Sequence, residues 1–142
     1  MENEFKLTIS GKSINEGFAR VVVSAFVAPL DPTLEELADL KTAVSEAVTN
    51  SIVHGYGDKC GNIYITGKLK DDTVRITIRD RGCGIPDVEQ ARMPLFTTGG
   101  ADRAGLGFTV MESFCDKVSV RSRLGSGTTV ALTKRIAGKA KW

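Results

Sequence analysis

The sequence predicts an α+β fold in which one mixed or antiparallel sheet is covered by helices on one face. Apolar and polar residues alternate around short turns in two pairs of segments, as in β-hairpins: 63–69 with 74–79, and 117–123 with 128–135. Elsewhere, apolar residues recur at helical spacing. Since amphipathic helices must bury one face against the sheet, these elements predict a two-layer sandwich. The length of 142 residues suits a single domain, 1–142.

The first half of the chain contains a predicted strand and two predicted helices. Residues 6–10 alternate as a half-buried strand does, and the apolar run 18–30 has helical length. The Asp-Pro pair at 31–32 is typical of a helix start, a cap followed by proline in the first turn. Apolar positions then recur every three or four residues. This helix is expected to run to about His54, with Gly55 as a left-handed stop.

The second half joins the two hairpins by less regular segments. Residues 86–92 have the composition of a short helix, and 96–104 have that of a loop. Helical spacing returns at 106–114. A third helix is therefore expected to follow a glycine-rich loop.

Composition and charge exclude several classes of function. The 19 Lys+Arg and 17 Asp+Glu residues give a net charge of +2, too small to indicate binding to nucleic acid or an acidic membrane. Three cysteines without a C-x-x-C pair favour neither a disulfide framework nor a zinc site. The N-terminus lacks the pattern of a secretory leader, and the longest apolar run, 21–30, is too short for a bilayer. We therefore expect a cytoplasmic protein without nucleic-acid or membrane partners.

The first candidate site lies on the long predicted helix. Glu46 and Asn50 are four residues apart and share one helix face, so both can act on one ligand, and His54 continues the row. The alternative is that Glu46 and Asn50 are ordinary solvated positions and that His54 interacts with the helix dipole.

The second candidate site directly follows a predicted strand. Asp80 can accept a hydrogen bond from the exocyclic amine of a base, while Gly82 and Gly84 let the backbone approach a flat ligand or another segment. The alternative is a tight turn in which Asp80 binds the amides of its own loop.

The third candidate site is the glycine-rich segment 96–108, which leads into the third helix. A helix N-terminus offers free N–H groups and the positive end of the dipole, and both suit phosphate. Gly105 and Gly107 permit close approach. No Gly-Lys-Ser/Thr follows, and Val110 stands where G-x-G-x-x-G requires its third glycine, so Walker A and Rossmann motifs are excluded. A plain flexible loop is the alternative.

The three motifs together resemble one superfamily. The sequence E-A-V-T-N-S-I-V-H-G-Y at 46–56, then D-x-G-x-G at 80–84 and G-x-G at 105–107, is similar to the N, G1 and G2 boxes of the GHKL ATPases. That superfamily includes gyrase, heat-shock chaperone ATPases, histidine kinases and MutL. The single His of the chain lies inside the first motif, and there is no room for a separate phospho-accepting helical domain, so histidine autophosphorylation is not expected.

Further segments resemble a smaller group within the superfamily. Phe-Thr-Thr at 96–98 and Gly-Thr-Thr at 127–129 look like the small anti-sigma serine kinases. The segments 15–20 and 30–33 are similar to the branch that controls sigma F in sporulating bacteria. The glycine pair at 99–100 departs from the expected lid, which leaves contact with the γ-phosphate open.

The resemblance implies the ATP-binding (Bergerat) fold and a role for each matched residue. Glu46 would be the general base, Asn50 the Mg²⁺ ligand and Asp80 the acceptor for the adenine amino group. Arg103 is a further candidate, a lid cation within reach of the γ-phosphate or a solvated charge. The remaining ATP-binding positions would be Gly82 and Gly84 against the base, Thr97 and Thr98 in the lid, Gly105, Leu106, Gly107 and Phe108 around the phosphates, and Thr128 at the adenine through a water.

Three functional hypotheses follow from this resemblance. The first is an anti-sigma factor that binds a sigma F-like factor as a homodimer and, with ATP/ADP and Mg²⁺, phosphorylates an anti-anti-sigma protein on serine. The second is the same chemistry for a general-stress sigma factor. The third is a non-catalytic, nucleotide-gated binding module, for which Glu46 has no use. Arg20 is the predicted partner-binding residue, on a helix whose other side chains are mostly expected to be buried.

Overall fold

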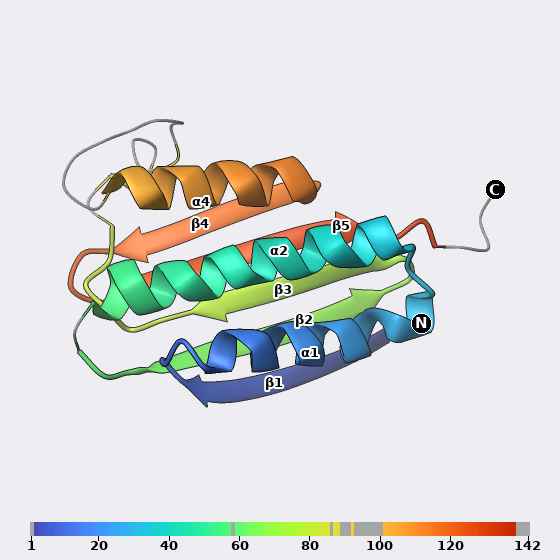
Figure 1. Cartoon of the computed structure of the whole chain (residues 1–142), viewed down its shortest axis with the longest axis horizontal. Helices are drawn as coiled ribbons and strands as arrows, with labels where there is room; N and C mark the ends of the chain where they lie inside the picture. The colour runs from blue at the N-terminus through green and yellow to red at the C-terminus, as the bar shows by residue number, and fades with distance from the viewer. Residues whose placement is uncertain (1, 58, 86, 89–91, 93–100, 139–142) are drawn as a thin grey trace.

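The computed structural model describes residues 2–57, 59–85, 87–88, 92 and 101–138. Within them, one five-stranded sheet has the order β1-β2-β3-β5-β4, and every neighbouring pair is antiparallel. Figure 1 shows the long helices on one face of this sheet, which confirms the predicted α+β sandwich. The elements are β1 (Glu2–Ser10), α1 (Asn15–Val27), α2 (Leu34–Asn50), β2 (Asn62–Lys70), β3 (Thr73–Arg79), α4 (Ala101–Phe114), β4 (Lys117–Arg123) and β5 (Gly127–Arg135).

The core lies between the sheet and α2. On β3, Val74, Ile76 and Ile78 are fully buried, whereas Arg75 and Arg79 are exposed on the other face. This alternation is the one that the sequence predicts. The helices contribute the other half of the core, with fully buried side chains at Leu40, Ala43, Val44, Ala47 and Val48 of α2 and Met111 of α4.

The start of α2 differs from the prediction. Asp31 is not its cap, because Asp31 has left-handed backbone angles (φ 50°) and ends the short 3₁₀ helix η1 (Ala28–Leu30). Thr33 caps α2 instead. Its hydroxyl accepts from the Glu36 amide at 3.1 Å, and the Glu36 carboxylate accepts from the Thr33 amide at 2.9 Å. These reciprocal bonds form a capping box.

The end of α2 also differs. The α-helix stops at Asn50 and continues as a π-helical segment, η2 (Ser51–Tyr56), which ends at Gly57 (φ 62°). The predicted stop at Gly55 is therefore wrong, and Gly55 lies inside the wider turn. Such π-helical turns are rare and frequently occur at functional sites.

The exposure of α1 contradicts the expectation that its apolar side chains are mostly buried. Phe18 is 50% exposed and Val21 65% exposed, while only Ala19, Val23 and Val27 of this helix are buried. The helix is fixed to α2 through Glu16, whose carboxylate accepts from the hydroxyls of Ser45 and Thr49. The outer side of α1 is thus apolar and open.

Two predicted segments lie wholly or partly outside the described residues. Of the short helix at 86–92, only 87–88 and 92 are described, with Val88 and Arg92 helical. Of the loop at 96–104, residues 101–104 belong to α4, so the helix begins earlier than expected. No helix in the described ranges is long and apolar enough to cross a membrane.

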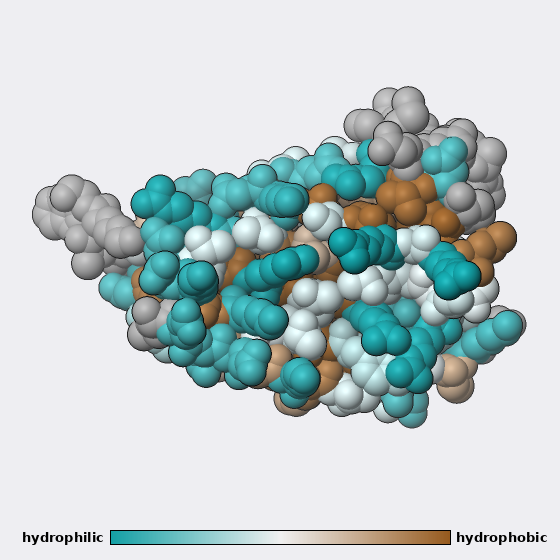
Figure 2. All heavy atoms as spheres, turned by 180° about the vertical axis from the view of Figure 1, so that it is seen from behind, coloured by the Kyte–Doolittle hydropathy of each residue, from teal (hydrophilic) through white to brown (hydrophobic). Residues whose placement is uncertain are grey.

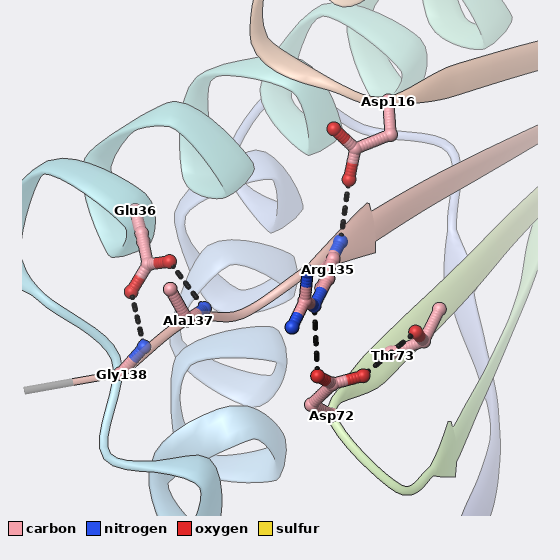
Figure 3. Close-up of polar contacts among 7 residues, drawn as sticks. All are labelled: Glu36, Asp72, Thr73, Asp116, Arg135, Ala137 and Gly138. Carbon is pink, nitrogen blue, oxygen red and sulfur yellow. Dashed lines mark hydrogen bonds and ion pairs between the residues drawn. The ribbon is translucent and has the colours of Figure 1, made fainter. Parts of the chain in front are cut away.

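The chain after β5 is fastened at the end of the sheet where α2 begins (Figure 3). The amides of Ala137 and Gly138 donate to the Glu36 carboxylate at 2.6 and 3.1 Å. Arg135 donates through its amide to Asp116 at 2.6 Å and through Nε to Asp72 at 2.8 Å. The candidate site residues lie at the opposite end, where α2 and β3 finish and α4 begins (Figure 1).

Candidate functional site

Glu46 and Asn50 lie together against the backbone of α4. A Cβ atom built on Gly107 would lie 3.0 Å from Asn50 Nδ2, 3.2 Å from Asn50 Oδ1 and 3.3 Å from Glu46 Oε2. The predicted pairing of these two side chains on one helix face is therefore confirmed, and glycine at 107 is what lets α4 approach them. A larger residue there would occupy the space in front of both polar groups.

The Asn50 side chain is not an ordinary solvated position. It is 9% exposed, and its buried Nδ2 has no hydrogen-bond partner among the described residues. An unpaired buried amide costs about 1–3 kcal/mol, so a native fold retains one where a catalytic role, strain, a bound ion or a water accounts for it.

Asp80 is buried at the end of β3, with 3% exposure. Its Oδ1 accepts from the Gly82 amide at 2.9 Å and from the Thr128 amide at 3.3 Å. Oδ2 accepts no hydrogen bond from the described residues and would lie 2.9 Å from a Cβ atom on Gly55. The alternative in which Asp80 binds the amides of its own loop thus holds for Oδ1. Oδ2 remains available as a hydrogen-bond acceptor.

The two glycines after Asp80 are needed for packing within the protein. A Cβ atom on Gly82 would overlap the carbonyl oxygen of Gly55, and one on Gly84 (φ 79°) would overlap that of Arg123. The Cys83 amide also donates to Gly55 at 2.9 Å. The sequence left open whether these glycines let the backbone approach a flat ligand or another chain segment. The structure shows the approach to other chain segments.

Thr128 is buried at the start of β5, beside Asp80. Its hydroxyl lies 2.8 Å from the Ser122 hydroxyl, and its carbonyl accepts from the Asp80 amide at 2.9 Å. The strand ends of β3, β4 and β5 are therefore joined by a polar network behind the Asp80 carboxylate.

Sequence reasoning missed several residues that shape this site. Gly55 carries the contact with Asp80, although it was interpreted as a helix stop. Gly127 (φ 115°) has no room for a Cβ atom beside the Asp80 carbonyl, and the Tyr56 hydroxyl accepts from the Arg81 amide at 2.8 Å. All three belong to the quoted motifs, whereas nothing in the sequence singles out Ser122.

The structure places the predicted phosphate-binding residues within α4. Gly105, Leu106, Gly107 and Phe108 lie within α4, whose described part starts at Ala101. Phe108 also packs its side chain in the core. Arg103 lies in the first turn of α4, and Thr97 and Thr98 lie outside the described residues.

The donor set fits a nucleotide with a hard cation. The unused oxygen of Asp80 suits an exocyclic amine, and the Asn50 amide can offer an oxygen to a cation such as Mg²⁺. No cluster of three or more His, Cys, Asp or Glu residues suitable for a metal occurs in the described part of the chain. Magnesium commonly takes one or two protein ligands and completes its shell with phosphate and water, so this sparse set is compatible with it.

Arg20 lies on α1, apart from these residues. Its side chain is 44% exposed, and Nε is 4.0 Å from Glu16 Oε1, a separation that gives only a weak surface ion pair.

The fold, with Asp80 at the end of β3 and with Glu46 and Asn50 together on α2, is that of an α+β domain with a candidate nucleotide site. The chain matches the model of the histidine kinase-like ATPase domain over residues 14–134. The chain belongs to this family, and its resemblance to the GHKL superfamily is confirmed.

Two curated relatives share nearly their whole length with this chain. The anti-sigma F factor of Geobacillus kaustophilus (strain HTA426) is 55% identical over 139 residues, which cover 96% of this chain and 95% of the relative. The anti-sigma F factor of Bacillus subtilis (strain 168) is 54% identical with the same coverage. The predicted resemblance to the sigma F branch is thereby confirmed.

A solved structure supports the fold independently. The crystal structure of the RsbU and RsbW domains of Rv1364c from Mycobacterium tuberculosis superposes with a TM-score of 0.69 at 22% identity. The match covers 94% of this chain and 32% of that chain.

Proposed function

We propose that this protein is an anti-sigma factor that binds a sigma F-like factor and also phosphorylates a serine of an anti-anti-sigma antagonist. Identity of 55% with an anti-sigma F factor over 96% of the chain supports the first part. The observation that carries the second part is the Glu46 carboxylate beside Asn50, both of which lie close to Gly107 of α4. A module that only bound nucleotide would have no use for this carboxylate.

The proposed chemistry assigns a task to each polar group. Asp80 Oδ2 accepts from the adenine amine, and the Asn50 oxygen binds Mg²⁺, which supplies charge neutralisation for the phosphates. Glu46 accepts the proton of the attacking serine hydroxyl. The N–H groups at 101–104, together with Arg103, Thr97 and Thr98, are the proposed phosphate and lid contacts. Glycines at 82, 84, 105 and 107 admit close backbone approach, and Thr128 reaches adenine through a water.

The proposed partner surface is the outer side of α1. Ile14, Phe18 and Val21 are exposed there, beside the weakly paired guanidinium of Arg20. Exposed apolar residues that surround an arginine are typical of protein interfaces. We assign this surface to the homodimer and to the sigma factor, whose role in transcription implies action in the cytoplasm.

Two assays on the full chain test the proposal. With ATP and Mg²⁺, the protein should transfer the γ-phosphate to the anti-anti-sigma protein but not to a copy whose acceptor serine is alanine. Immobilised protein should retain sigma F from a mixture that also contains a general-stress sigma factor. Preferential retention of the general-stress factor would assign the other client, and sigma binding without any transfer would identify a non-catalytic module.

The surface assignment needs its own variant. Arg20→Glu should weaken capture of sigma factor or of the antagonist and leave ATP affinity unchanged. Arg92→Glu serves as a control charge reversal, because Arg92 pairs with Glu112 away from α1. Equal capture by both variants would move the docking surface elsewhere.

A further inference from the structure

The open face of the sheet carries a concentration of positive charge that the net charge of the chain conceals. Figure 2 looks onto this face, opposite the helices, and shows hydrophilic side chains over much of it. The strand register sets two cross-strand rows. The first row consists of Arg79, Thr129 and Arg121. The second row consists of Arg75, Thr133 and Lys117. The cations in both rows are exposed, and β3, β4 and β5 contain no acidic residue.

A hollow of about 220 Å³ lies at one end of this face. Three arginines from two strands line it: Arg79 of β3, and Arg121 and Arg123 of β4. Gly127 opposes Arg123 in the register, so no side chain fills the space between the strands there. The rest of the lining is Ser122, Ser126, Thr128, Thr129 and Asp80.

The three arginines are not neutralised within the described part of the protein. None of them takes part in an ion pair there, and the recorded contact of Arg79 is with the Tyr64 ring, 5.8 Å from its centroid. The Asp80 carboxylate approaches Gly55 and accepts from Gly82 and Thr128, so its charge is directed to the helix side of the sheet. Like charges gathered in one place oppose folding, and an anion would remove that repulsion.

We propose that this hollow binds a phosphate monoester group. Arginine guanidinium groups form paired, charge-assisted hydrogen bonds with tetrahedral oxyanions, and the Ser126 and Thr129 hydroxyls supply further donors. Three positive charges match a phosphate dianion better than a single carboxylate. The volume lies below the roughly 300–1,000 Å³ of pockets for whole small molecules. The hollow therefore suits one phosphoryl group, either free or on a phosphorylated side chain.

This hollow shares Asp80 and Thr128 with the candidate nucleotide site, but its three arginines lie on the other face of the sheet. The nucleotide residues face the helices from α2, α4 and the inner side of the sheet, whereas the arginines lie on exposed strand positions of the opposite face. The proposal does not depend on kinase activity and can be tested without ATP.

The experiment is a titration of the isotope-labelled full chain followed by NMR at physiological salt. The probes are inorganic phosphate, a phosphoserine peptide, the unphosphorylated peptide and acetate. Phosphate should shift the amides of Ser126 and Thr129 and the Nε–H signals of the lining arginines. Arg121→Gln should weaken binding at least tenfold, while Arg75→Gln, on the same face but outside the hollow, should change it less than twofold.

Some outcomes identify the source of the phosphoryl group, and others show that the hollow is not a phosphate site. Tighter binding of the phosphoserine peptide than of free phosphate would indicate a phosphorylated protein, and equal binding would indicate a small anion. Equal affinity for acetate, equal loss in both variants, or shifts confined to residues near Gly107 would each overturn the proposal. Unchanged amide spectra of the two variants away from the substitutions serve as the folding control.

Discussion

Gly107 of α4 lies close to the side chain of Asn50, because a Cβ atom at 107 would lie only 3.0 Å from Asn50 Nδ2. This close approach brings the middle of α4 to the candidate metal ligand and makes the position sensitive to a single methyl group.

Gly107→Ala should weaken nucleotide binding by displacing Asn50 or α4. In a helix, alanine normally adds about 0.5–1 kcal/mol of stability relative to glycine. Gly17→Ala is the matched control, since its Cβ would meet Arg20 at an ordinary 3.7 Å. Calorimetric titration with ATP should show reduced affinity for Gly107→Ala. The affinity of Gly17→Ala should equal that of the unmodified protein. If Gly107→Ala binds ATP with normal affinity, the close approach of Gly107 to Asn50 is not part of the nucleotide site.

Glu46→Gln and Asn50→Ala should have different effects. A general base is worth about 10²–10⁴ in rate, so Glu46→Gln should retain ATP binding and slow serine phosphorylation by that factor. Asn50→Ala should lose the Mg²⁺-dependent part of binding as well. Single-turnover transfer and titrations with and without Mg²⁺ measure the two effects. A wild-type transfer rate for Glu46→Gln would reject the general-base assignment.

Selectivity for adenine should depend on the free oxygen of Asp80. Guanine would present a carbonyl oxygen to this carboxylate, and two unpaired acceptors cost about 1–3 kcal/mol, or roughly 10–100-fold in affinity. Competition titrations should therefore show much weaker binding of GTP than of ATP. Asp80→Asn should narrow the difference, because an amide can also donate. Equal affinity of the unmodified protein for both nucleotides would argue against this site.

The Glu36 carboxylate should make stability depend on pH. Desolvation opposes the shift, but hydrogen bonds from Thr33, Ala137 and Gly138 hold the pKa of Glu36 below its usual value of 4.5. A depressed pKa gives stability that is fully present above the unfolded value and is lost as pH falls through the folded value.

Glu36→Gln should therefore reduce the free energy of unfolding by about 1–2 kcal/mol near neutral pH. The difference from wild type should shrink as the pH falls below about 4. Urea unfolding across this pH range measures it. Glu35→Gln is the control, because Glu35 lies in the same helical turn but lacks these hydrogen bonds. If both variants lose the same free energy of unfolding, the effect comes from the helix dipole and not from the bonds of Glu36.

The three cysteine thiols should differ in their rate of alkylation. Cys60 and Cys83 are exposed, whereas burial, helped by smaller effects of Asp116 and Asp39 and opposed by Lys134, raises the pKa of Cys115 to about 11. Because the thiolate is the nucleophile, iodoacetamide at about pH 8 should modify Cys115 at least tenfold more slowly than the other two. Peptide mass spectrometry measures the rates, and urea should equalise them. Fast modification of Cys115 in the folded protein would contradict its assigned burial.

The sequence by itself determined the strands, both hairpins, the shared face of Glu46 and Asn50, and the family. These features depend on local alternation, helical spacing and motif order, which neighbouring residues set. Local signals were less reliable at helix ends. Asp31 has the right chemistry for a cap, but its left-handed backbone ends η1, and Thr33 takes the position through its bonds with Glu36.

Only the tertiary structure decided which distant groups meet. The π-helical turn carries Gly55 to Asp80, and the strand register gathers Arg79, Arg121 and Arg123 around one hollow although the whole chain has a net charge of only +2. Composition averages charge along the chain, whereas the pairing of β3 with β5 and of β5 with β4 sorts it between two faces. Close approach and charge concentration are properties of three-dimensional packing, which local sequence patterns do not specify.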